Sequence, residues 1–118
     1  MRSVFLDYAT VSFHDDLDPA ALRRALPGIE LRPHTPQSHV TETIAGAEAV
    51  LVNKLRLTRE IIERTPTLRL IALAATGTNN IDLDAAKERG VAVCNLRDYC
   101  TASVVQHVMG NLLLLTHK

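Results

Sequence analysis

This sequence of 118 residues contains few cysteines and few aromatic residues, and its formal net charge is zero. Two cysteines, Cys94 and Cys100, are too few for the disulfide framework of a small secreted domain, so we expect free thiols in a cytoplasmic protein. Thirteen basic residues balance thirteen acidic ones, which argues against a general attraction to nucleic acid or to an anionic membrane. The expected partners are therefore small molecules or proteins.

Long hydrophobic runs are also lacking. The apolar stretch at residues 112–115 is far shorter than the roughly 20 residues that a membrane-spanning helix needs. The first apolar run ends at Asp7, which is too early for the hydrophobic region of a signal peptide. We expect a soluble chain that is not exported, with a length suited to one domain around one core.

Glycine is sparse, and its spacing excludes one common motif. The five glycines nowhere form the G-x-G-x-x-G fingerprint that holds the pyrophosphate of a dinucleotide. A complete dinucleotide-binding site is therefore not expected within this chain.

Short apolar runs alternate with segments of helical periodicity, which is the pattern of βαβ units around a parallel sheet. Right-handed crossovers and a half-polar second strand favour the strand order 2-1-3-4-5. The predicted fold is a flavodoxin-like, doubly wound α/β domain with a five-stranded parallel sheet and helices on both faces. The five predicted strands are Val4–Leu6, Ile29–Arg32, Ala49–Val52, Leu70–Ala74 and Val91–Cys94.

Capping residues mark the predicted helices. Asp18 is the predicted N-cap of a helix that has Pro19 at its first position and ends near Gly28. Thr58 is predicted to cap a second helix, and Asp82 a third that ends at Gly90. The last helix is predicted to begin near Ser103, because residues 103–106 fit a capping box. This helix is apolar on more than one face, so we expect something outside the domain to cover it.

Candidate site residues follow the carboxyl ends of the predicted strands, where open α/β sheets bind their ligands. They are Asp7, Asn53-Lys54, the loop at residues 75–80 and Asn95. The loop reads Ala-Thr-Gly-Thr-Asn-Asn, and small residues of this kind let bare backbone N–H groups hold a carboxylate or phosphate. The same composition is also typical of a tight turn without a ligand.

Residues 68–95, together with Tyr99–His107, resemble the D-2-hydroxyacid dehydrogenase family in the region that leads into its interdomain helix. Within the family, the loop at residues 75–80 and Asn53-Lys54 are most similar to glycerate dehydrogenases, also called hydroxypyruvate reductases. The resemblance covers about the last half of the chain. Cys100 departs from the pattern, because relatives often have glycine there.

The resemblance implies an N-terminal substrate-binding domain, residues 1–118, cut off before the NAD(P)-binding domain, with an interdomain helix at about residues 101–117. Backbone amides of Thr76 and Gly77 would hold the carboxylate of a small 2-hydroxy or 2-keto acid, with Lys54 nearby. Thr101 would approach NAD or NADP. The catalytic residues would lie in the missing domain, so the chain alone is expected to be inactive. The whole protein would be a homodimer.

Other interpretations remain open. A free-standing flavodoxin-like binding or regulatory module fits the same element order, although a phosphoacceptor receiver would need an aspartate where Asn53 stands. Cys94, Cys100 and His107 match no familiar zinc spacing, so no metal is expected. His107 lies one turn inside the last helix, which favours packing over catalysis.

Overall fold

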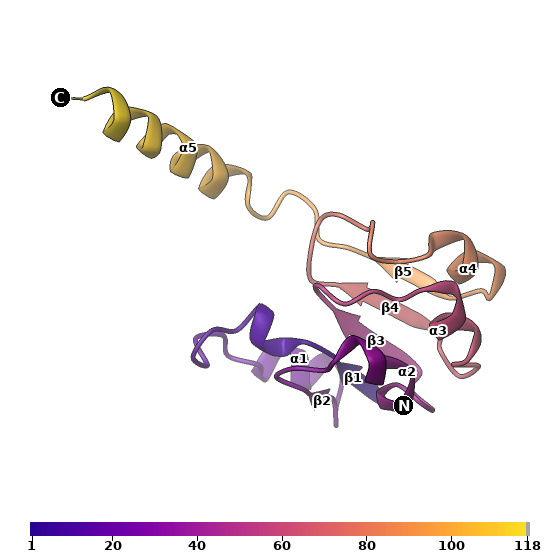
Figure 1. Cartoon of the computed structure of the whole chain (residues 1–118). Helices are drawn as coiled ribbons and strands as arrows, with labels where there is room; N and C mark the ends of the chain where they lie inside the picture. Colours follow the sequence, from indigo (N-terminus) through magenta and orange to yellow (C-terminus); the bar gives the residue numbers. More distant parts are fainter. Residues whose placement is uncertain (118) are drawn as a thin grey trace.

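The computed structural model describes residues 1–117 and contains one parallel sheet of five strands in the order β2-β1-β3-β4-β5 (Figure 1). The predicted fold class and strand order are confirmed. All four strand pairs are parallel, as the alternation of strands and helices indicated. The strands are β1 Ser3–Phe5, β2 Glu30–Leu31, β3 Ala49–Val52, β4 Leu70–Leu73 and β5 Ala92–Cys94.

The helices lie on both faces of the sheet. The β1-to-β2 crossover runs in the opposite direction to the later crossovers, so right-handed connections place α1 on one face and α2, α3 and α4 on the other. Their bounds are α1 Ala20–Ala25, α2 Val40–Thr43, α3 Arg59–Glu63, α4 Leu83–Glu88 and α5 Thr101–Thr116, with short 3-10 turns η1 Tyr8–Thr10 and η2 Gln37–His39.

The hydrophobic core lies between the sheet and helices α2 to α4. Alternate strand residues point to this face, and β-branched or leucine side chains fill it as the continuous apolar runs predicted. The buried strand positions that belong to this core are Val4, Val50, Val52, Ile71 and Leu73. Outside the core, the Arg59 guanidinium bonds Glu88 at 2.6 Å, joins α3 to α4, and lowers the pKa of that carboxyl.

The opposite face of the sheet is less well covered. Phe5 is buried there beside Tyr8, but no residue of α1 is buried, and Leu51 is only half-buried. Farther along the sheet, Ala92 and Cys94 are exposed. Among residues 1–117, α1 is the only α-helix on this face, at the β1–β2 side, and Tyr8 of η1 packs there against Phe5.

The predicted helix ends are partly confirmed. The start of α1 differs from the prediction, because Pro19 is its N-cap and the helix begins at Ala20, whose amide donates to Asp18 Oδ1 at 2.9 Å. Asp82 caps α4 by accepting a hydrogen bond from the Ala85 amide at 2.8 Å. Gly28 and Gly90 take φ values of +80° and +67°, which explains why glycine follows α1 and α4. Thr58 precedes α3 as predicted, but its side chain makes no capping hydrogen bond.

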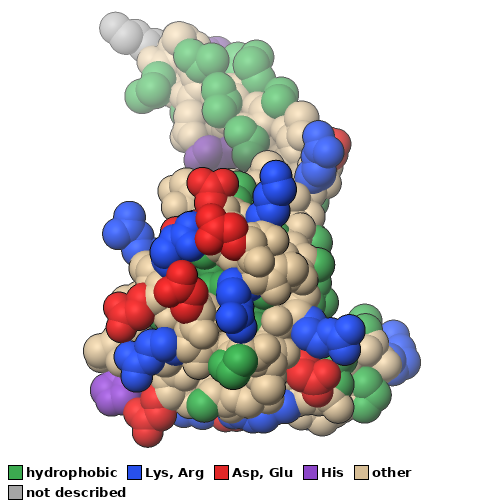
Figure 2. Space-filling view, turned by 90° about the vertical axis from the view of Figure 1, so that its right-hand side faces the viewer, with side chains coloured by type: hydrophobic (Ala, Val, Ile, Leu, Met, Phe, Trp, Pro, Cys, Tyr) green, Lys and Arg blue, Asp and Glu red, His purple; other side chains and the backbone are tan. Residues whose placement is uncertain are grey.

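Helix α5 projects away from the rest of the domain (Figure 1). The capping-box prediction at Ser103 is wrong, because the helix already begins at Thr101 and its N-cap, Cys100, uses no side-chain bond. All sixteen residues of α5 are exposed, with Leu115 at 82%. Apolar side chains gather on this helix, whereas charges of both signs are interspersed on the body (Figure 2).

We expect the chain to self-associate through α5 as its concentration rises. Burying exposed apolar surface yields about 25 cal/mol per Å², and a bare apolar patch of this kind marks a contact surface. Sedimentation should show the average mass rising with concentration, and the double substitution Leu114→Glu with Leu115→Glu should keep the chain monomeric. Asn111→Glu, on the same helix, serves as the control for added charge. A wild-type chain that stays monomeric throughout would contradict this expectation.

Candidate functional site

Asp7 organises the carboxyl end of the sheet. This side chain is only 2% exposed, and its carboxylate accepts three backbone hydrogen bonds from the segment after β3. Oδ1 accepts from the Asn53 amide at 2.9 Å, and Oδ2 accepts from the amides of Lys54 at 2.6 Å and Leu55 at 3.2 Å. Asp7 thereby fixes the backbone that carries Lys54. The sequence placed Asp7 at this edge but did not predict these bonds.

Two asparagines extend this network to the neighbouring loops. Asn53 donates from its side-chain amide to Thr10 Oγ1 at 2.9 Å, which ties the segment to η1. The side-chain amide of Asn80 donates to the carbonyls of Leu55 at 2.9 Å and Asn53 at 3.3 Å. The segment after β3 and the loop after β4 are therefore held against each other.

A cavity of about 280 Å³ opens between these two segments. The structure brings the predicted residues Lys54 and Gly77 together in its wall. Thr76 belongs to the same loop, is exposed, and does not line the cavity; its carbonyl accepts a bond from the Asn95 side chain at 2.6 Å. The lining residues are Asn53, Lys54, Ala75, Gly77, Asn79 and Asn80.

The backbone N–H groups of Thr76 and Gly77 are free to meet a ligand. Within residues 1–117, neither group donates a hydrogen bond to another residue. Gly77 has no positive φ, so backbone strain does not require glycine there. A Cβ at this position would lie 3.2 Å from Asn79 Oδ1, so a side chain would crowd the loop. Two exposed amides beside a lysine can hold a carboxylate.

Thr101 lies apart from this cavity. It is the first residue of α5, is exposed, and does not belong to the cavity wall. The first helical bond of α5 runs from the Val104 amide to the Cys100 carbonyl. Cys100 has φ of −123°, which any residue can adopt, so the backbone at position 100 does not require glycine. The helix N-terminus is thus formed without glycine.

The described residues offer no evident metal centre. Within residues 1–117, no three His, Cys, Asp or Glu side chains gather as metal ligands would. Cys94 and Cys100 are free thiols, and His107 is exposed on α5. In the same part of the chain, no helix combines the length and hydrophobicity that crossing a bilayer requires.

Bare amides and a lysine lie at the carboxyl edge of this open parallel sheet, which is the edge where open α/β sheets bind their ligands. The chain matches the model of the D-isomer specific 2-hydroxyacid dehydrogenase catalytic domain over residues 3–111. It therefore belongs to that family.

Individual relatives agree with this assignment. A putative 2-hydroxyacid dehydrogenase of Haemophilus influenzae is 36% identical over 118 residues, which cover 100% of this chain and 36% of that protein. A glycerate dehydrogenase of Methylorubrum extorquens is 40% identical over 81 residues, which cover 69% of this chain and 26% of the relative. The chain thus spans about a third of the length of such relatives or less.

Solved structures share the fold. An NAD-dependent formate dehydrogenase of Staphylococcus aureus, solved in complex with NAD, superposes with a TM-score of 0.74 at 25% identity. The superposition covers 98% of this chain and 38% of that one.

Proposed function

We propose that this chain is the substrate-binding domain of an NAD(P)-dependent oxidoreductase that exchanges hydride with C2 of a small D-2-hydroxy or 2-keto acid. The family supports the reaction class. The similarity to a glycerate dehydrogenase and to a hydroxypyruvate reductase, the latter 39% identical over 83 residues, supports a substrate of the glycerate and hydroxypyruvate type. The free thiols of Cys94 and Cys100 are consistent with a protein that resides in the reducing cytoplasm.

The observation that carries the proposal is the cavity that Lys54 and Gly77 share. We infer that the amides of Thr76 and Gly77 hold the substrate carboxylate, and that the Lys54 ammonium adds a charge of the opposite sign. The bonds from Asp7 to the Lys54 and Leu55 amides keep this wall in place. A substrate held against a fixed wall has already lost translational and rotational entropy, so less of that entropy is lost on reaching the transition state.

The cofactor would be held mainly by a second domain. When bound, the nicotinamide would supply or accept the hydride. This chain has no glycine fingerprint for a pyrophosphate. Its first α5 turn, with exposed Thr101 and no capping side chain, fits a contact to a cofactor held elsewhere. We propose that α5 is the interdomain helix, that an NAD(P)-binding domain covers it and supplies the catalytic residues, and that the whole protein is a homodimer.

The chain by itself should neither bind NADH nor reduce hydroxypyruvate or glyoxylate. Free amides and Lys54 can hold a keto acid, but binding alone does not lower the barrier selectively, and a proton donor for the carbonyl oxygen is also needed. Calorimetric titration should give no saturable heat up to millimolar NADH. Absorbance of NADH should decline no faster than in buffer when either keto acid is added.

A protein of this sequence joined to an NAD(P)-binding domain is the matched comparison, and it should show both activities. Micromolar NADH affinity or steady turnover by the 118-residue chain would contradict the proposed division of labour. If the joined protein also bound no keto acid, a regulatory module without catalysis would be the better interpretation.

A further inference from the structure

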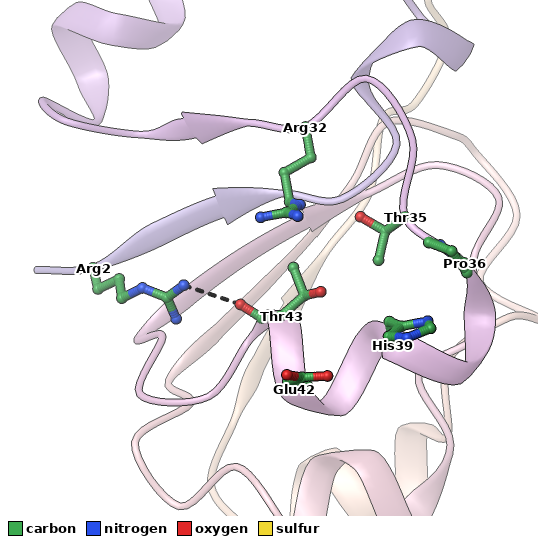
Figure 3. Close-up of a pocket in the computed structure, with 7 residues that line it drawn as sticks. All are labelled: Arg2, Arg32, Thr35, Pro36, His39, Glu42 and Thr43. Atoms are coloured by element: carbon green, nitrogen blue, oxygen red, sulfur yellow. Dashed lines mark hydrogen bonds between the residues drawn. The ribbon is translucent and has the colours of Figure 1, made fainter.

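A second cavity, of about 470 Å³, lies between the β1–β2 edge of the sheet and α2 (Figure 3). It shares no lining residue with the cavity that contains Lys54 and Gly77. Its volume falls within the range of roughly 300–1,000 Å³ that small-molecule sites usually have. The proposed function does not use this cavity.

One wall of the cavity carries two arginines on either side of Glu30. Arg2 is largely occupied, because it donates to the carbonyls of Thr43 at 3.0 Å and Ala45 and lies 3.4 Å from Glu30 Oε2. Arg32 bonds Glu30 through Nη1 alone. Within residues 1–117, the other guanidinium nitrogens of Arg32 donate to no residue. Arg32 therefore retains donors that match a carboxylate.

Thr35 adds a buried hydroxyl without a partner. The residue is 1% exposed, and its Oγ1 makes no hydrogen bond with any described residue. In Figure 3 this oxygen points towards Arg32 rather than away from the cavity. A buried polar group without a partner is unfavourable, so a ligand that bonds Thr35 would remove this penalty.

The opposite wall carries a carboxylate. Glu42, on α2, lines the cavity across from Arg32 (Figure 3), and no described residue pairs with its side chain. His39 lies beside it, with Nδ1 3.2 Å from Ser38 Oγ, and its Nε2 has no hydrogen-bond partner among residues 1–117. The cavity thus has the unpaired donors of Arg32 and Thr35 on one side and the negatively charged carboxylate of Glu42 on the other.

We propose that this cavity binds a small zwitterion of the amino-acid type. The ligand carboxylate would bond the free nitrogens of Arg32 and the Thr35 hydroxyl, and the ligand ammonium would face Glu42. A simple anion would leave Glu42 opposed to it, and a simple amine would leave Arg32 unmatched. Only a ligand with both charges complements both walls.

Chemical-shift titration of the ¹⁵N-labelled chain with the common L-amino acids tests this proposal. At least one should give saturable shifts at residues 30–43 at millimolar concentration or below. The best binder is then compared with its analogue that lacks the amino group and its analogue that lacks the carboxyl group. Each analogue should bind at least about tenfold more weakly, a loss of one ionic contact.

Variants assign the binding to named side chains. Arg32→Gln and Glu42→Gln should each weaken binding about tenfold or more, while Glu60→Gln, an exposed carboxylate on α3, should leave it unchanged. Thr35→Val should weaken binding yet raise the midpoint of urea unfolding, because it removes a buried unpaired hydroxyl without changing the volume. If the Thr35 hydroxyl served only to stabilise the fold, Thr35→Val would instead lower the midpoint of urea unfolding.

Three outcomes would overturn the proposal. They are no saturable shift with any amino acid, equal binding of the analogue without an amino group, and unchanged binding by Arg32→Gln and Glu42→Gln. None of these measurements depends on hydride transfer, so they fail or succeed independently of the proposed oxidoreductase function.

Discussion

Replacing Asp7 by alanine should lower the free energy of unfolding by about 3–5 kcal/mol, since a buried backbone N–H without a partner costs roughly 1–3 kcal/mol. Asp7 is buried and accepts from three amides, of Asn53, Lys54 and Leu55. Solvent can reach part of this group after the substitution, which keeps the loss below the full sum. Such a loss is a large share of a total stability of about 5–15 kcal/mol. Urea denaturation monitored by circular dichroism measures the change.

Two variants bracket this effect. Asp7→Asn keeps one carbonyl acceptor and should lose less stability than Asp7→Ala. Asp84→Ala changes an exposed carboxylate in the first turn of α4, and should cost about 1 kcal/mol or less. If Asp7→Ala lost no more than Asp84→Ala, the three hydrogen bonds would not hold the segment after β3 in place.

In a protein that contains both domains, Gly77→Val should raise KM for the keto acid about tenfold or more, which corresponds to at least about 1.4 kcal/mol of lost binding. A Cβ at Gly77 would already lie 3.2 Å from Asn79 Oδ1, so we expect the two further methyl groups of valine to crowd the loop and hinder approach to the Thr76 and Gly77 amides. The dissociation constant for NAD(P)H should change little. Steady-state kinetics and a cofactor titration separate the two quantities.

Gly77→Ala is the graded control for this substitution. Its single methyl group meets the end of a flexible asparagine side chain, so a small shift of Asn79 can accommodate it. We expect an increase in KM well below that of Gly77→Val. Equal losses of keto-acid and cofactor binding would show that the loop at residues 75–80 serves structure rather than substrate binding.

The sheet could be predicted from the sequence because its evidence is local. The apolar runs at residues 49–52 and 70–73 are continuous, as is typical of central strands in a parallel sheet, and both form strands inside the sheet rather than at its edges. Asp82 and Gly90 lie at the helix ends where capping chemistry places them. The same evidence put Lys54 and Gly77 at one edge of the sheet, since parallel strands end together.

The parts that could not be predicted depend on contacts made by the tertiary fold. Asp7 bonds a segment 46 to 48 residues away, and Arg32 lines the same cavity as Glu42 although the two belong to different elements of the fold. The periodicity of apolar residues along the chain does not indicate which polar side chains come together in the fold. The error at Ser103 has a different cause, because the capping-box pattern is compatible with residues already inside a helix. A local motif therefore does not show whether Ser103 precedes the helix or already lies within it.

We expect the hydrogen bonds between Asp7 and the segment after β3 to form late in the folding of the chain. They join residues separated by 46 to 48 positions, and β1 pairs with β3 across a similar separation. Closing such a loop costs entropy before any contact compensates for it, which slows the folding of parallel sheets. The wall that carries Lys54 can therefore form only once β1 and β3 have met. We expect a partly folded chain with isolated helices to lack the edge that carries Lys54, so the appearance of that edge would report the formation of the central sheet.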